Sequence, residues 1–162
     1  MRELIDKKSA LEQSPTSRLP TFEPEWVSRI KGTVDFLGLN YYTANLVTSA
    51  PPSEVKSWGT DSETKRWLNP DWPKSATFWL RVVPWGLRKL LNWIKNEYNN
   101  PEMLITENGV SDKGEMDDTC RIDYLQAHIN QVLKAIKLDN CNVTGYMAWS
   151  LMDNFEWNSG YK

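Results

Sequence analysis

Three apolar segments separated by two amphipathic helical patterns constrain the fold of this chain more than any other feature. The segments are residues 34–42 (VDFLGLNYY), residues 103–107 (MLITE) and the beginning of residues 143–157 (VTGYMAWSLMDNFEW). Their β-branched, aromatic and aliphatic residues show little polar alternation, which is typical of strands buried on both faces. The order strand, helix, strand, helix, strand predicts an α/β fold with parallel strands joined by right-handed crossover connections.

The spacing of apolar residues predicts the two long helices. Residues 84–98 begin with Pro84, which suits a first helical turn, and their apolar stripe consists of Leu87, Leu90, Leu91 and Ile94. Asp117 or Asp118 is predicted to cap the second helix, which continues to Lys137. Its apolar positions are spaced by threes and fours: Ile122, Leu125, His128, Ile129, Val132, Leu133 and Ile136.

The remaining segments predict little regular structure. Residues 1–19 are polar and predict a fraying helix followed by a surface connection. Pro24 predicts the first turn of a short helix that stops at Gly32. Residues 43–83 are rich in Pro, Ser, Asp and Trp and predict a loop. A loop of this length inside a compact domain favours a functional role for it.

The composition excludes several classes of protein. With 162 residues, 40% of them hydrophobic and 25% charged, the chain is expected to form a single globular domain over residues 1–162. No apolar run approaches the roughly 20 residues that cross a bilayer, so no membrane segment is expected. The net charge is −2 and the Lys and Arg residues are scattered, so no nucleic-acid partner is expected.

Few residues in the chain are suited to a zinc site of the Cys/His kind. Cys120, Cys141 and the single His128 do not form a zinc-binding pattern, and the two cysteines are expected to be unpaired. His128, on the second long helix, is expected to be a packed or capping histidine rather than a catalyst. Nine tryptophans stand out, because such rings fill cores and also provide flat apolar surfaces for sugars. Composition alone favours core packing.

Polar side chains follow each predicted strand at the end where parallel α/β folds bind their ligands. They are Asn40 and Tyr42, then Glu107 and Asn108, and finally Ser150, Asn154 and Glu156. Asn108 and Gly109 also fit a simple turn, but VSDKGEMDD after Gly109 does not fit the return strand of a hairpin. From these residues alone, Glu107 remains either a catalytic carboxylate or part of a turn that leaves the strand.

Four segments resemble glycoside hydrolase family 1, the retaining β-glucosidases and β-galactosidases. They are SRLPTF at 17–22, DFLGLNYYT at 35–43, ITENG at 105–109 and WSLMDNFEW at 149–157, in the order of the family. The resemblance implies the C-terminal part of a (β/α)₈ TIM barrel, about strands 6 to 8. It also implies hydrolysis of O-glycosyl bonds in a small β-glycoside or oligosaccharide, without a cofactor or metal.

The resemblance also implies roles for individual residues. Glu107 corresponds to the nucleophile, which forms a covalent glycosyl-enzyme, and Tyr42 to the tyrosine that orients it and keeps it ionised. The implied substrate-binding residues are Asn40, Trp149, Glu156 and Trp157. A weaker assignment places Trp85 and the 43–83 segment on the aglycone side.

The chain departs from the family at the acid/base residue, because it has no Asn-Glu-Pro segment. Glu102 in NNPEM precedes the wrong strand and is not a substitute. The chain on its own is therefore expected to be unstable and nearly inactive. The alternatives are a non-catalytic carbohydrate-binding pseudoenzyme and a truncated gene product. Neither the preferred sugar nor the localisation, whether secreted or cytoplasmic, follows from the sequence.

Overall fold

The computed structural model describes residues 2–55 and 57–161 and divides into two compact units. The first unit comprises residues 1–34 and 46–67, and the second comprises residues 35–45 and 68–162. No helix in the described part of the chain is both long and apolar enough to cross a membrane.

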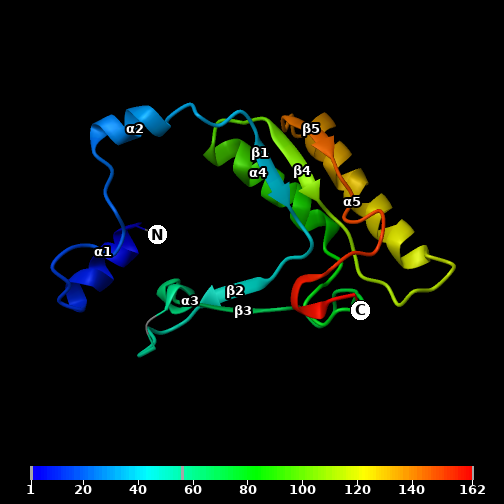
Figure 1. The fold of residues 1–162 in the computed structure, drawn as a ribbon, viewed down its shortest axis with the longest axis horizontal. Coiled ribbons are helices and arrows are strands. Elements are labelled where there is room, and N and C mark those ends of the chain that lie inside the picture. Colours follow the sequence, from blue (N-terminus) through cyan, green and yellow to red (C-terminus); the bar gives the residue numbers. More distant parts are fainter. Residues whose placement is uncertain (1, 56, 162) are drawn as a thin grey trace. The chain divides into compact units, whose positions relative to one another are not determined.

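The second unit, here the sheet unit, has the predicted alternation of strands and helices (Figure 1). Its strands are β1 (Leu37–Asn40), β4 (Met103–Glu107) and β5 (Val143–Tyr146), and its helices are α4 (Pro84–Glu97) and α5 (Thr119–Lys137). The sheet order is β1-β4-β5, and both pairs are parallel. The α/β prediction is therefore confirmed, although β1 and β5 are shorter than the apolar segments that contain them.

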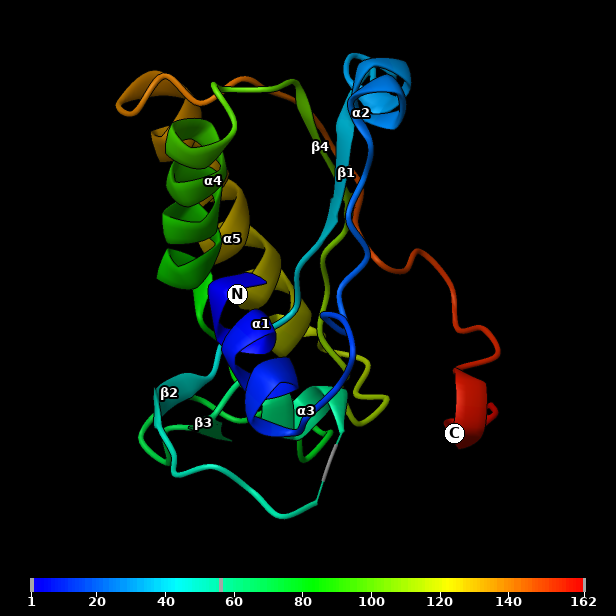
Figure 2. The same ribbon diagram turned by 90° about the vertical axis from the view of Figure 1, so that its left-hand side faces the viewer.

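Both long helices cover the same face of this sheet, as Figure 2 shows. The core lies between them and the strands, and its buried residues are Tyr41, Leu87, Leu91, Ile94, Met103, Ile105, Val132, Ala135 and Cys141. The opposite face, here called the open face, carries Asn40 and Thr106, whose side chains are hydrogen-bonded to each other. A Cβ at Gly38 would also contact Thr106 there.

The prediction of strands buried on both faces is wrong for β1. Its residues alternate between half-buried and exposed, and Phe36 just before it is 50% exposed. The reason is that β1 is an edge strand and only one face of the sheet packs on helices in this unit.

The predicted apolar stripe of α5 is only partly right. His128 and Val132 are buried, but Ile122, Ile129 and Leu133 are about half exposed or more. The face that packs on the sheet and α4 is narrower than the stripe.

The predicted helix ends are confirmed. Pro84 lies in the first turn of α4, and the Asp118 side chain accepts a hydrogen bond from the Arg121 amide at the start of α5. Asp139, just after α5, joins the two helices because its carboxylate accepts two hydrogen bonds from Arg88, at 2.7 and 2.8 Å, and one from Asn92, at 2.7 Å. These charge-assisted bonds hold the pKa of Asp139 well below its usual value.

The first unit contains α1 (Arg2–Leu11), α2 (Pro24–Ile30), α3 (Trp58–Asp61) and the antiparallel strands β2 (Leu46–Ser49) and β3 (Thr64–Trp67). The helices predicted near the chain start and after Pro24 are thus confirmed. The expectation of a continuous loop over residues 43–83 is wrong, because this segment supplies the hairpin and α3. Strands of four residues are too short to show a clear alternation in the sequence.

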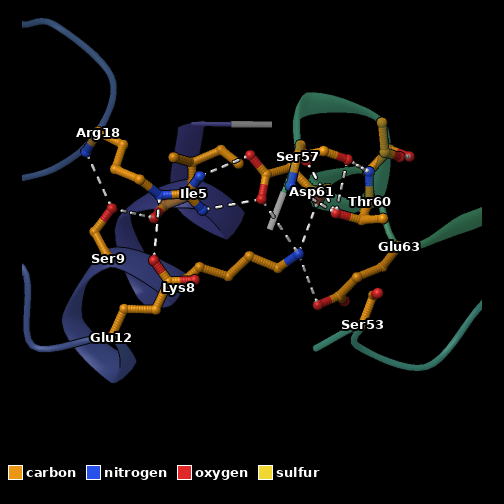
Figure 3. A network of polar contacts seen from close by, with 12 residues as sticks. Ile5, Lys8, Ser9, Glu12, Arg18, Ser53, Ser57, Thr60, Asp61 and Glu63 are labelled. Carbon is orange, nitrogen blue, oxygen red and sulfur yellow. Dashed lines mark hydrogen bonds and ion pairs between the residues drawn. The ribbon is translucent and has the colours of Figure 1, made fainter. Parts of the chain in front are cut away.

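A polar network fastens α1 to α3 and the start of β3 (Figure 3). Arg18 donates two hydrogen bonds of 2.9 Å to the carboxylate of Asp61. Lys8 donates to the Asp61 carbonyl at 3.0 Å and lies 3.1 Å from the Glu63 carboxylate. The buried hydroxyl of Ser9 accepts from the Arg18 amide at 3.0 Å. Arg18, part of the SRLPTF segment, therefore has a structural role in this unit.

Candidate active site

Glu107 lies at the end of β4, immediately after a β-bulge. Leu39 pairs with Ile105. The next residue of β1, Asn40, pairs with Glu107, so Thr106 has no partner across the ladder. Strict alternation from the buried Ile105 would point Glu107 toward the helices. The extra residue breaks this alternation at the end of the strand, just before Glu107.

The carboxylate of Glu107 accepts a hydrogen bond from the hydroxyl of Tyr42, with 2.5 Å between the oxygens. Tyr42 comes just after Tyr41, whose ring is in the core. Burial raises the pKa of Tyr42 far above its ordinary value, and the bond to Glu107 and the charges of Glu107 and Glu156 raise it further. Tyr42 therefore remains a protonated donor at any physiological pH.

A second pair of predicted site residues is formed by Trp149 and Glu156. The indole N–H of Trp149 donates to the Glu156 carboxylate at 3.1 Å. The backbone at Trp149 approaches the end of β4, because its amide donates to the main-chain carbonyl of Asn108 at 2.9 Å. A Cβ at Gly109 would lie 1.7 Å from the Trp149 carbonyl oxygen. The glycine of ITENG thus lets the WSLMDNFEW segment pass close to the end of β4.

The other two predicted binding residues are placed differently. The Asn40 side chain accepts from the Thr106 hydroxyl at 2.5 Å, so it lies beside the bulge rather than on the Glu107 carboxylate. Trp157 begins a short 3₁₀ helix (Trp157–Ser159), and its side chain is 86% exposed. The structure therefore brings together Tyr42 with Glu107 and Trp149 with Glu156, while Trp157 faces solvent.

Aromatic residues before α4 and in its first turn are arranged in two groups. The Trp79 ring lies edge-on to Tyr42, with centroids 6.2 Å apart. Trp85 packs edge-on against Trp72 at 5.6 Å and lines a groove of about 580 Å³ with Arg88 and other residues of α4 and α5. The tryptophan beside the Tyr42–Glu107 pair is Trp79, which sequence reasoning did not single out.

Behind Glu107 lies a buried polar cluster that the sequence only partly indicated. Asn108 is fully buried, and its amide donates to the Tyr41 carbonyl at 2.6 Å and to the Tyr124 hydroxyl at 3.0 Å. Its side-chain carbonyl oxygen accepts a hydrogen bond from the Tyr146 hydroxyl at 2.6 Å. Burial raises the pKa of Tyr146 to about 12. The signal in the sequence was Asn108 itself, since a buried amide requires polar partners.

The structure separates Glu102 from this site. Glu102 precedes β4 while Glu107 ends it, so the two residues lie at opposite ends of the strand, about 16 Å apart at the usual strand rise. The Glu102 carboxylate accepts from the Thr144 hydroxyl at 3.0 Å. Among residues 2–55 and 57–161, no group of three or more His, Cys, Asp or Glu side chains is placed to hold a metal ion.

Comparison with known proteins matches the chain to one family over its whole length. The family described as Glycosyl hydrolase family 1 matches residues 1–162. Myrosinase 1 of Brevicoryne brassicae is 45% identical over 99% of this chain and 35% of its own length. The cytosolic beta-glucosidase of Homo sapiens is 44% identical over 97% of this chain and 34% of its own length.

Solved structures show the same relation. The structure of aphid myrosinase superposes with a TM-score of 0.86 and 45% identity, covering 99% of this chain and 35% of the myrosinase. The beta-glucosidase of the fungus Humicola insolens, solved in complex with glucose, gives a TM-score of 0.79 and 38% identity, covering 95% of this chain and 35% of that enzyme. The chain thus spans about a third of the length of these relatives, and its parallel sheet with two crossover helices is consistent with part of a (β/α)₈ barrel. The chain belongs to glycosyl hydrolase family 1.

Proposed function

We propose that the chain forms the C-terminal part of the barrel of a retaining β-glycosidase. The strands β1, β4 and β5 would correspond to about strands 6 to 8 of that barrel. All of residues 1–162 would then belong to one catalytic domain. The relatives support this proposal, since they include beta-glucosidases and myrosinases of which the chain spans about a third. The substrate class is a small β-glycoside or oligosaccharide.

The observation that carries the proposal is the hydrogen bond from Tyr42 to Glu107 at the end of a parallel strand. In the first step a Glu107 oxygen bonds to the anomeric carbon while the glycosidic C–O bond breaks. The departing oxygen takes a proton from a second carboxyl group. The Tyr42 hydroxyl orients the attacking carboxylate, because a short bond to a charged oxygen is strong and directional.

In the second step water replaces Glu107 on the sugar. The second carboxyl group, now ionised, takes a proton from the water, whose oxygen bonds to the anomeric carbon as the bond to Glu107 breaks. This restores both carboxyl groups to their initial states. Glu102 is not proposed for the role because it lies at the other end of β4. Residues 1–162 alone are therefore expected to be nearly inactive.

The sugar itself would be held by Trp149, Glu156, Trp157 and Asn40. The Glu156 carboxylate, already fixed by the Trp149 indole, is suited to accept hydrogen bonds from two sugar hydroxyls. The Trp149 ring is 41% exposed and offers an apolar surface to a sugar ring.

Substitution of Glu107 tests the proposal in the complete barrel enzyme that contains residues 1–162. Glu107→Gln keeps the shape of the side chain but removes the nucleophile, so kcat for an aryl β-glucoside is expected to fall by about 10⁴-fold or more. The matched control is Glu102→Gln, just before the start of the same strand, which should retain kcat. A mechanism-based fluorosugar should label Glu107.

Two outcomes would contradict this function. An active enzyme in which Glu107→Gln retains kcat, or in which the fluorosugar labels another residue, would remove Glu107 from its role. A complete protein that binds glucose, detected by tryptophan fluorescence, but hydrolyses no aryl glycoside would favour the non-catalytic carbohydrate-binding alternative.

A further inference from the structure

We propose that Tyr124 and Asn108 are positioning residues that hold Tyr42 against the Glu107 carboxylate. This inference rests on the proposed function and extends it to a residue of helix α5. Tyr124 comes from α5, and Asn108 directly follows Glu107.

Tyr42 needs such support because the sheet does not hold it. β1 ends at Asn40, and the last sheet-like bond beyond it runs from the Tyr41 amide to the Glu107 carbonyl, at 2.9 Å. Residues 41–45 have no helical or strand structure. The orientation of the Tyr42 ring therefore depends on how its own peptide unit is fixed.

Two buried side chains fix the carbonyl groups of this segment. The Tyr124 hydroxyl donates to the carbonyl of Tyr42 at 2.9 Å, and the Asn108 amide donates to the carbonyl of Tyr41 at 2.6 Å. The same amide donates to the Tyr124 hydroxyl at 3.0 Å. The Tyr124 hydroxyl thus accepts one bond and uses its one proton on Tyr42, which leaves a single arrangement of donors and acceptors.

The burial of this cluster makes its hydrogen bonds hard to replace. Tyr124 is 1% exposed and Asn108 is 0% exposed, and the Asn108 oxygen is occupied by the Tyr146 hydroxyl. The Tyr124 ring is itself stacked on His128, with centroids 3.9 Å apart. Removing one hydroxyl leaves buried polar groups unpaired, which costs more free energy than the loss of an exposed hydrogen bond. The hydrogen-bonded path from the Tyr124 hydroxyl to the Glu107 carboxylate runs through Tyr42.

This path predicts that the effect of Tyr124 on catalysis disappears when the Tyr42 hydroxyl is absent. In the complete enzyme, Tyr124→Phe keeps the ring on His128 and is expected to lower kcat/KM about 10-fold, the loss of one hydrogen bond. Tyr42→Phe alone is expected to lower it about 100-fold. In the Tyr42→Phe background, adding Tyr124→Phe should cost less than about 2-fold, because the two residues act through the same contact.

The matched control is Tyr41→Phe. This change also removes a buried hydroxyl bonded to a carbonyl, that of Val83 at 2.8 Å, but this bond leads to the start of α4. Any effect it has on kcat/KM should be the same with and without the Tyr42 hydroxyl. Melting temperatures measured for all variants separate loss of folding from loss of positioning.

Defined results would overturn the inference. A Tyr124→Phe effect that is equal in both backgrounds, as for general destabilisation, or that is absent, would remove Tyr124 from this role. Asn108→Ser is the second variant if Tyr124→Phe does not fold. Its effect on kcat/KM is likewise expected to disappear in the Tyr42→Phe background. An enzyme whose fluorosugar label lies elsewhere than Glu107 would instead overturn the proposed function.

Discussion

Gly109 shows how one residue determines the approach of two segments at the candidate site. It directly follows the Glu107–Asn108 pair, and the Trp149 carbonyl passes so close that any side chain at this position collides with backbone. Backbone atoms, unlike the end of a flexible side chain, cannot move aside without shifting the whole segment. The glycine is therefore required by packing rather than by a turn, although Asn-Gly in the sequence is equally typical of a turn.

Gly109→Ala is expected to destabilise the complete enzyme by about 1–3 kcal/mol, the usual cost of overpacking. It should also lower kcat/KM, because Trp149 and its partner Glu156 are displaced together. Thermal melting and steady-state kinetics measure the two effects. Gly59→Ala is the control, since a Cβ there would lie 3.7 Å from the nearest atom. Equal melting temperatures for the two variants would contradict the packing argument.

Among the elements, α1 depends on long-range ionic contacts more than on a buried face. Its buried residues are Ile5 and Ser9, and the ion pairs of Lys8 and Arg18 connect it to the segment around Asp61. The pKa of Asp61 is lowered, chiefly by its hydrogen bonds with Arg18. A carboxyl group with a lowered pKa stabilises the fold above its ordinary pKa of about 3.9 and loses this effect as the pH falls below it.

Asp61→Asn is therefore expected to increase amide hydrogen exchange across α1 at neutral pH. The difference from the wild type should shrink as the pH falls below about 4, where Asp61 itself becomes protonated. Pulse-labelling exchange at several pH values tests this. Glu3→Gln is the control on the same helix, because the Glu3–Lys7 pair is 83% and 70% exposed and such pairs contribute little. An equal exchange rate for the wild type and Asp61→Asn at pH 7 would contradict a stabilising role for the Asp61 contacts with Lys8 and Arg18.

At the scale of the whole molecule, many large apolar side chains are exposed. They include Val34, Phe36, Phe78, Ile122, Leu133, Leu151, Met152 and Phe155, all at least 50% exposed. Exposed apolar surface of this extent is typical of a surface that another part of a protein covers. Since the chain spans about a third of the length of its relatives, the remainder of a barrel is the proposed cover.

Residues 1–162 expressed alone should therefore bind a hydrophobic dye such as ANS and melt without a sharp transition. The complete enzyme should bind far less dye and melt cooperatively. Dye fluorescence and calorimetry at equal molar concentration make the comparison. A monomeric chain of 162 residues with a sharp melting transition and low dye binding would contradict the proposal.

The sequence by itself determined the elements whose signals are local. The order of strands and helices in the sheet unit, Pro84 in the first turn of α4, the Asp118 cap and the end of β4 at Glu107 all follow from residues within a few positions of each other. The four motif segments likewise indicated the family. These features depend on backbone preferences and short-range spacing, which act before distant parts of the chain meet.

Only the tertiary structure decided how these elements meet at the candidate site. The bulge at Thr106 breaks the alternation just before Glu107, and the hydrogen bond to Tyr42 joins residues 65 positions apart. Tyr124 reaches the same segment from α5. Strand register and the partners of buried polar groups depend on which distant segments pack together, and local preferences carry no information about that choice.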